Sequence, residues 1–401
     1  MSDKPVIGIA GFGLEGKAAY EYFRGTAELH IFDEHDIDMS GIDATFHKGL
    51  TIPGFVSILY KSPGIPTSKV VLESPQTRLS TLMDIVLEKA RPRSIGVTGT
   101  KGKSTVASLI FHILKSSGRD AVLFGNIGVA DMRLFEADGP ERIYVLELSS
   151  YQCEHITRSP HVAVLTNLYP EHLNHHGSFE AYREAKLNIA RFQTPEDVFI
   201  NGSDIKTSFS GKMIEPSSGN LFKTKLLGEH NQRNCALAVA AVAEYDVTEE
   251  EAREHIATFE PLPYRLERVG EFKGITFYDD SLATVPEATL ASIKALPHVD
   301  TIILGGEDRG ISFTKFADEL EKTSTATFIV FPDTGPIMVT NVQDRTVVPV
   351  SSMEEAVKVA FQNTPQGGTV LLSNASPSFN LFKDYKDKSA QYREWIQKLA
   401  S

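Results

Sequence analysis

Cysteine is scarce in this chain of 401 residues, which contains only Cys153 and Cys235. Two cysteines cannot build a disulfide framework, so we expect a protein of the reducing cytosol. Positive charge is also short, because 40 lysines and arginines stand against 52 aspartates and glutamates, for a formal net charge of −12. This balance argues against a general binder of nucleic acid or anionic membranes, which needs an excess of lysine and arginine. It still allows one small anionic ligand in a local basic or glycine-lined pocket.

Long apolar runs are absent as well. No stretch approaches the roughly 18–20 apolar residues that a membrane-spanning helix requires. Residues 5–14 contain glycines, which indicate a strand that leads into a turn rather than a signal peptide. A hydrophobic share of 41% with 23% charged residues is ordinary for globular proteins and excludes wholesale disorder. At roughly 150 residues per domain, the length predicts two or three domains.

Short apolar strands alternate with amphipathic helices, which predicts an α/β protein with parallel sheets and helices on both faces. The alternation restarts after residues 91–93 and again near 261–263, so we expect domains at 1–91, 92–262 and 263–401. The expected strands are residues 6–10, 29–32, 57–60, 94–98, 144–148, 162–166, 275–278, 301–304, 327–331 and 369–372. The expected helices are residues 17–23, 82–90, 106–114, 179–192, 231–244, 287–295, 313–322, 353–361 and 389–399.

The strongest local motif is a glycine-rich turn, Gly-Thr-Lys-Gly-Lys-Ser at residues 99–104, between an apolar strand and an apolar helix. Backbone N–H groups of such a turn can face a phosphate, aided by the positive end of the helix dipole. Lys103 would contact the β- and γ-phosphates, and the Ser104 hydroxyl would bind Mg²⁺. The strict phosphate-loop spacing fails, because Val97 stands five residues before Gly102. The strand-to-helix setting nevertheless favours nucleotide binding over a chance glycine-rich loop.

A second glycine loop at residues 11–16 matches G-x-G-x-x-G, and Asp33 follows at the distance of a ribose-binding acid. Alone, this fingerprint would suggest a nicotinamide-dependent oxidoreductase. Two separate phosphate loops in one chain instead favour an enzyme with two phosphorylated substrates.

Three further residues follow apolar strands or lie on an apolar helix face. Glu147 ends a strand and is either a Mg²⁺ ligand or an acid facing water. His172 lies in a loop near the same expected sheet edge and is either a ligand or a surface residue. Lys186 points along the apolar stripe of its helix. Sequence alone favours a snorkelling side chain for this lysine over a lysine placed in a site.

Together these motifs resemble the Mur ligases over nearly the whole chain and in the family's order. The resemblance is carried by residues 99–104, 147–152, 167–173, 228–234, 262–267 and 279–281 and by the helix with Lys186. Within the family, residues 62–65, 126–128 and 371–383 are most similar to the glutamate-adding members. A folylpolyglutamate synthase would share the central domain but would lack the first ~90 residues with their own phosphate loop.

The resemblance implies a Rossmann-like N-terminal domain, a P-loop ATP-binding central domain and a Rossmann-like C-terminal domain. It implies an ATP-dependent amide ligase that adds D-glutamate to UDP-N-acetylmuramoyl-L-alanine through an acyl phosphate, in peptidoglycan precursor synthesis. The alternatives are an L-glutamate-adding ligase of the same family and, from another class, the oxidoreductase. ATP and Mg²⁺ are the expected cofactors. We expect a cytoplasmic monomer with small-molecule substrates and no nucleic-acid or membrane partner.

By the same resemblance, the site residues form four groups. ATP would contact Gly99, Thr100, Gly102, Lys103, Ser104, Thr105, Asn231, Asn234, Arg265 and Asp279. The UDP-sugar would contact Gly11, Gly13, Gly16, Asp33, Ser62, Gly64 and Asn126. Metal ions would be held by Ser104, Glu147, His172 and a carbamylated Lys186, and Lys103, Glu147, His172 and Lys186 would serve catalysis. Glutamate would contact Thr284, Arg309, Ser378 and Tyr385.

The chain departs from the family pattern at three places. Leu282 stands where the family has a lysine, and residues 171–174 read Glu-His-Leu-Asn in place of Asp-His-Leu-Asp. Arg309 replaces a lysine expected to pair with the glutamate side chain. An arginine can hold a carboxylate through two hydrogen bonds, so a dicarboxylic amino acid remains the expected substrate. The choice between D- and L-glutamate stays open.

Overall fold

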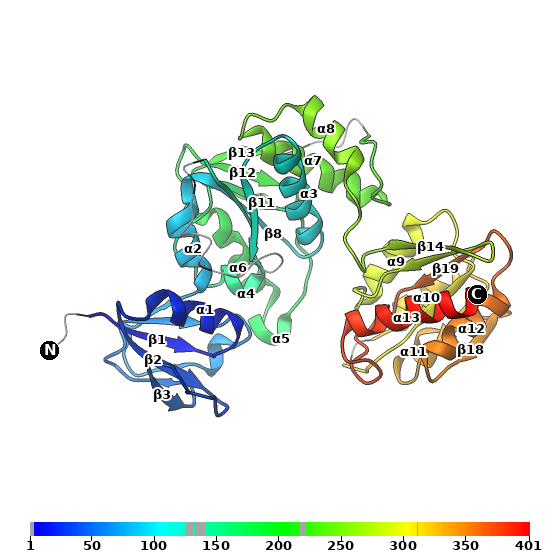
Figure 1. The fold of residues 1–401 in the computed structure, drawn as a ribbon, viewed down its shortest axis with the longest axis horizontal. Helices are drawn as coiled ribbons and strands as arrows, with labels where there is room; N and C mark the ends of the chain where they lie inside the picture. The colour runs from blue at the N-terminus through cyan, green and yellow to red at the C-terminus, as the bar shows by residue number, and fades with distance from the viewer. Residues whose placement is uncertain (1–3, 126–131, 133–138, 140, 217–220, 311) are drawn as a thin grey trace. The chain divides into compact units, whose positions relative to one another are not determined.

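The computed structural model describes residues 4–125, 132, 139, 141–216, 221–310 and 312–401. The chain forms two compact units (Figure 1). The first unit comprises Met1–Lys223 and Gln232–Phe259, and the second comprises Thr224–Asn231 and Glu260–Ser401. Among the helices that the structure describes, none combines the length and hydropathy needed to cross a bilayer.

The first unit opens with a five-stranded parallel sheet of order β3-β2-β1-β5-β7. Its strands are β1 (Val6–Ala10), β2 (Glu28–Asp33), β3 (Thr45–Lys48), β5 (Ile58–Lys61) and β7 (Arg78–Ser80). Helices α1 (Leu14–Phe23) and α2 (Leu82–Ala90) and a short ribbon of β4 (Thr51–Ile52) and β6 (Val71–Leu72) accompany it. Strand β1 pairs with β2 on one side and β5 on the other, so the strand order reverses there. Parallel sheets bind ligands at such a switch point, outside the carboxyl ends of the strands.

The same unit contains a second parallel sheet, of order β13-β12-β11-β8-β10-β9. Its strands are β8 (Ser94–Thr98), β9 (Ala121–Gly125), β10 (Ile143–Glu147), β11 (Val162–Leu165), β12 (Val198–Asn201) and β13 (Lys212–Ile214). The accompanying helices are α3 (Lys103–Ser116), α4 (Ser150–Cys153), α5 (Leu173–His176), α6 (Phe179–Arg191), α7 (Glu229–Ala243) and α8 (Glu249–Thr258). Strands β8, β10 and β11 are neighbours and buried throughout. Their carboxyl ends therefore meet at one edge, where polar residues can gather.

The second unit has a six-stranded sheet of order β14-β15-β19-β16-β17-β18. Its strands are β14 (Glu267–Phe272), β15 (Ile275–Asp279), β16 (Thr301–Leu304), β17 (Thr327–Val330), β18 (Thr346–Pro349) and β19 (Thr369–Leu372). Its helices are α9 (Pro286–Ala295), α10 (Thr314–Glu321), α11 (Thr334–Met338), α12 (Met353–Asn363) and α13 (Tyr385–Ala400). Only β14 is antiparallel to its neighbour among the described strands of this sheet.

The predicted fold class, α/β with parallel sheets, is confirmed. One large sheet falls within each of the three predicted domain ranges. The domain boundaries stay a prediction, because the structure divides into two compact units and not three. The expected linker at 91–93 is a 3-10 turn, Arg91–Arg93, between α2 and β8. Helix α1 begins three residues earlier than predicted and α13 begins four residues earlier. The antiparallel strand β14 was not predicted.

Candidate active site

The central glycine turn closes tightly between β8 and α3. Gly99 has φ +146°, and a Cβ there would lie 1.9 Å from the Thr166 hydroxyl oxygen. Gly102 precedes the helix with φ +82°, and its Cβ would lie 2.8 Å from Asn234 Oδ1. Only glycine fits both positions, because other residues rarely adopt such φ values and no space exists for a side chain. The turn therefore brings the first backbone N–H groups of α3 to a position suited to a phosphate.

Hydrogen bonds fix this turn to the segment after β11. The Lys101 N–H donates to Asn167 Oδ1 at 2.8 Å, and the Thr166 hydroxyl donates to the Lys101 carbonyl at 2.6 Å. The Thr100 N–H donates to the Asn167 carbonyl at 2.9 Å. The turn is thus held in shape by the protein itself.

Ser104 and Glu147 meet at the carboxyl edge of this sheet. The Ser104 hydroxyl, in the first turn of α3, donates to Glu147 Oε1 at 3.2 Å. The carboxylate lies at the end of β10 and is fully buried. Lys103, next to this pair, donates from Nζ to the Thr100 carbonyl at 2.9 Å. The interpretation of Glu147 as an acid facing water is therefore wrong.

Lys186 is buried in the same region, with 1% of its surface exposed. Its Nζ donates to the Thr98 hydroxyl at 3.4 Å and lies 4.9 Å from the centroid of the Tyr182 ring. Burial and, second, the charge of Lys103 lower the pKa of the Lys186 amine to about 7. The snorkelling interpretation is wrong, because the amine itself is inside the protein.

His172 lies on the open side of this group. Its side chain is 45% exposed, and its ring centroid is 5.1 Å from that of Tyr151 and 6.3 Å from that of Tyr182. Partial burial lowers the pKa of His172, opposed by Glu171. The structure therefore gathers four of the predicted metal or catalytic residues at one sheet edge, with His172 beside them. These four are Lys103, Ser104, Glu147 and Lys186.

The first glycine loop lies at the switch point of the N-terminal sheet. Gly11 has φ +82°, and a Cβ on Gly16 would lie 2.0 Å from the Gly11 carbonyl oxygen. Asp33 Oδ2 accepts the Phe12 N–H at 2.9 Å, and the Ser62 hydroxyl donates to the Gly11 carbonyl at 2.8 Å. Asp33 and Ser62 thus support the loop, and their direct contact with a UDP-sugar stays a prediction.

The other predicted UDP-sugar residues have few contacts in the structure or lie outside the described residues. Gly13 directly precedes α1, and a Cβ built on Gly13 or on Gly64 would meet no other atom within 4 Å. Asn126 lies outside the described residues. Of the remaining ATP residues, Thr105 follows Ser104 on α3, and Asn231 and Asn234 are buried on α7.

Asp279, predicted to contact ATP, is fully buried at the end of β15. Its carboxylate accepts hydrogen bonds from Ser281, Ser389 and Arg393. The nearby Arg265 lies just before β14. Since three side chains already bind the Asp279 carboxylate, a contact with ATP would require this group to rearrange.

The predicted glutamate residues occupy loops at the carboxyl ends of β15, β16 and β19 and the start of α13. Arg309 donates to Glu307 at 3.0 Å, and its guanidinium lies 5.5 Å from the Phe379 ring centroid. Ser378 is buried in the loop after β19. Thr284 is half-buried, and Tyr385 at the start of α13 is 37% exposed. Arg309 and Ser378 thus lie on neighbouring loops of one sheet edge.

Comparison with known proteins decides the family. The Mur ligase middle domain matches residues 97–217, and the Mur ligase glutamate ligase domain matches residues 264–375. A UDP-N-acetylmuramoyl-L-alanine–L-glutamate ligase of Salinispora tropica is 32% identical over 98% of each chain. The chain belongs to the Mur ligase family. This membership confirms the predicted resemblance and the prediction of a ligase.

Other relatives agree with this assignment. A UDP-N-acetylmuramoylalanine–D-glutamate ligase of Symbiobacterium thermophilum is 31% identical over 86% of this chain and 84% of its own. The structure of the MurF ligase of Thermotoga maritima in complex with ADP is similar with a TM-score of 0.60. It covers 98% of this chain and 96% of its own at 16% identity, so it supports the fold.

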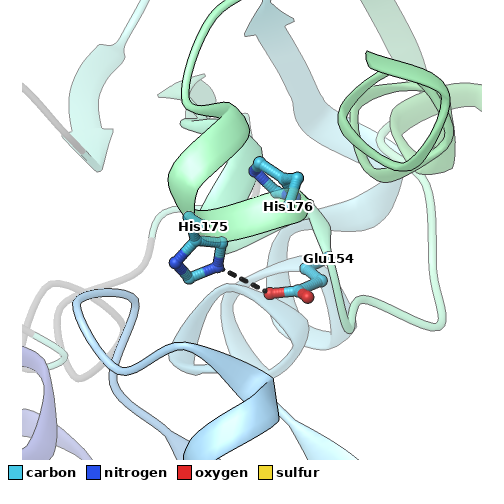
Figure 2. Close-up of side chains that lie close together, drawn as sticks. All are labelled: Glu154, His175 and His176. Carbon is cyan, nitrogen blue, oxygen red and sulfur yellow. Dashed lines mark hydrogen bonds and ion pairs between the residues drawn. The ribbon is translucent and has the colours of Figure 1, made fainter. Parts of the chain in front are cut away.

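The structure of this Mur ligase also shows a cluster that sequence reasoning missed, formed by Glu154, His175 and His176 (Figure 2). His175 Nε2 lies 3.3 Å from Glu154 Oε2, and potential ligand atoms of all three residues lie within 4.8 Å of one another. The Lys61 ammonium lies 3.7 Å from the same carboxylate, and the Thr67 hydroxyl donates to it at 3.0 Å. Because a lysine already neutralises Glu154, we assign the cluster to the contact between the first two sheets. The His-x-x-His-His run at 172–176 was the available signal.

Proposed function

We propose that this Mur ligase catalyses the ATP-dependent addition of glutamate to the alanyl carboxylate of UDP-N-acetylmuramoyl-L-alanine. The observation that carries the proposal is the buried group of Ser104, Glu147 and Lys186 beside a glycine turn suited to phosphate. Two relatives named as glutamate ligases, one matched over 98% and the other over 86% of this chain, support the substrate class. The proposed reaction uses soluble precursors of peptidoglycan, and we propose that it proceeds in the cytoplasm on a monomeric enzyme.

The residues present fit a magnesium ion. The Ser104 hydroxyl and the Glu147 carboxylate are hard oxygen ligands only 3.2 Å apart, at the start of the helix expected to bind the phosphates. When bound, Mg²⁺ would offset negative charge on the transferring phosphoryl group. His172 is the proposed further ligand on the exposed side.

Lys186 is proposed to carry a carbamate. Its neutral amine would attack CO₂, form a C–N bond and release a proton, which converts a buried cation into an anion with oxygen ligands. A pKa near 7 leaves a large neutral fraction for this reaction at physiological pH. This change would also remove the repulsion between the Lys186 and Lys103 ammonium groups.

In the proposed reaction, the alanyl carboxylate attacks the γ-phosphorus of ATP, and ADP leaves. The resulting acyl phosphate is attacked by the glutamate amine, an amide bond forms, and phosphate and a proton are released. Lys103 and the N–H groups of the glycine turn would stabilise charge on the phosphoryl oxygens. The loop at residues 11–16 would bind the diphosphate of the UDP-sugar, and Arg309 with Ser378 would bind glutamate.

The deciding experiment measures phosphate release with ATP, UDP-N-acetylmuramoyl-L-alanine and single amino acids in parallel. We expect release only when both acceptor and glutamate are present. ATP turnover without an acceptor, or hydride transfer to a nicotinamide, would overturn the proposal. D-glutamate was the enantiomer predicted from the sequence, and L-glutamate is the second candidate because a full-length relative carries that name. The ratio of kcat/KM for the two enantiomers decides between them.

A further inference from the structure

Helix α13 carries a lysine on its inward face, where a cation is unusual. Lys388 is 1% exposed and lies on the same face as the buried Tyr392 and Ile396. Burial lowers the pKa of Lys388 to about 8, partly opposed by Asp279 and Asp280. A buried charge is costly unless hydrogen bonds or opposite charges compensate it, so its retention needs a reason.

The Lys388 ammonium begins a chain of hydrogen bonds. Its Nζ donates to Asn374 Oδ1 at 2.8 Å. Asn374 then donates from Nδ2 to the Gly305 carbonyl at 2.6 Å, and the Gly305 N–H donates back to the Asn374 carbonyl at 3.0 Å. The lysine therefore determines which way the Asn374 amide faces, since its oxygen must meet the ammonium and its NH₂ group must meet Gly305.

Beyond Asn374, further hydrogen bonds connect the loop after β16 with the loop after β19. The Glu307 N–H donates to the Pro377 carbonyl at 2.6 Å, and the Ser376 hydroxyl donates to the Glu307 carbonyl at 2.6 Å. The Glu307 carboxylate in turn accepts two hydrogen bonds from Arg309. These contacts lead from the buried lysine to the two loops that carry Arg309 and Ser378.

We infer that Lys388 is a positioning residue for the amino-acid pocket, acting through Asn374 on the loops that present Arg309 and Ser378. The inference rests on the proposed function, because that function assigns the pocket to glutamate. Lys388 itself is buried beneath the loops and contacts protein atoms in the structure. Its ammonium interacts with the charges of Asp279, at the end of β15, and Asp280, just after it, and donates to Asn374 two residues after β19.

The test compares Lys388→Met with the wild type in the phosphate-release assay, varying glutamate, ATP and the UDP-sugar in turn. Methionine keeps an unbranched side chain and removes the donor. We expect the KM for glutamate to rise roughly tenfold or more, while the KM values for ATP and the UDP-sugar change by less than about twofold. Lys388→Arg keeps a charged donor and should restore much of the glutamate affinity.

A second variant covers the case in which Lys388→Met does not fold. Asn374→Asp keeps an acceptor for the lysine but removes the amide donor to Gly305, so it should raise the KM for glutamate in the same way. Where Lys388→Met folds, it can be combined with Asn374→Asp. The KM for glutamate of this double variant should be no higher than that of the more severe single variant, because both substitutions interrupt the same series of hydrogen bonds. Ile396→Val, on the same buried face of α13, is the control for a general loss of packing and should leave the KM for glutamate unchanged.

An unchanged KM for glutamate in Lys388→Met or in Asn374→Asp overturns the inference, as does an equal rise in all three KM values. These outcomes differ from failure of the proposed function. In that case, the wild type itself would release no phosphate in response to glutamate.

Discussion

The neutral amine of Lys186 should make activity depend on both pH and dissolved CO₂. With a pKa of about 7, this amine is roughly three-quarters neutral at about pH 7.5. An ordinary lysine, with a pKa of about 10.4, is neutral in roughly one molecule per thousand at that pH. Burial therefore increases the form that reacts with CO₂ by several hundredfold. Between about pH 8 and pH 6, the neutral fraction should fall from about nine tenths to about one tenth.

The assay follows ATP-dependent phosphate release across this pH range at fixed dissolved CO₂. We expect activity to fall by more than tenfold toward the acidic end where CO₂ is limiting, because the neutral amine becomes scarcer and carbamate formation also releases a proton, and to recover as CO₂ is raised. Lys186→Ala should lose activity by about two to three orders of magnitude at every CO₂ concentration. Lys115→Ala, which replaces an exposed lysine near the end of α3, is the matched control and should behave like the wild type.

Intact mass spectrometry after chemical trapping should find one added CO₂ in the wild type and none in Lys186→Ala. Two results would refute the reasoning. One is full activity of Lys186→Ala in buffer freed of bicarbonate. The other is wild-type activity that does not respond to CO₂ at any pH while no added mass is found.

Three further predictions concern the remaining parts of the two units. Glu147→Gln, which keeps the shape but removes the charge, should lower kcat about a hundredfold and raise the Mg²⁺ concentration needed, and an unchanged Mg²⁺ titration would contradict this. Gly16→Ala should abolish UDP-sugar binding in calorimetry, because its Cβ would lie 2.0 Å from the Gly11 carbonyl oxygen, whereas Gly54→Ala, outside the glycine loop and 3.5 Å from Ser74 Cβ, should retain binding. Burial raises the pKa of Asp280 to about 6, so the folded state binds more protons than the unfolded state between about pH 4 and 6. The free energy of unfolding should therefore fall as pH rises through that window. In melting curves recorded across this pH range, Asp280→Asn should lack this pH-dependent loss of stability.

The elements that were predicted well are those whose sequence pattern depends on burial alone. Strands β8 and β19 are apolar, buried along their length, and flanked by polar residues or glycine, so their bounds could be read directly. Strand β14 is mostly half-exposed and carries Glu267 and Glu271, so no apolar run marks it. The start of α13 was placed too late because its first turn is polar. That turn is fixed by Asp384, whose carboxylate accepts the N–H groups of Lys386 and Asp387.

For the site, the sequence predicts which residues reach a sheet edge, but it does not show which polar groups the protein has already bound. Asp33 and Asp279 were both predicted to contact substrates, yet in the structure both carboxylates accept hydrogen bonds from protein groups. Lys186 could be placed on an apolar helix face by spacing, but only its burial and its contact with Thr98 in the structure show that the amine is inside. Lys388 carried no motif, because its role depends on an asparagine that is distant in sequence and adjacent in space. Hydrogen-bond partners therefore show which polar groups already have a protein contact that a ligand would have to share or displace, and these partners depend on tertiary contacts.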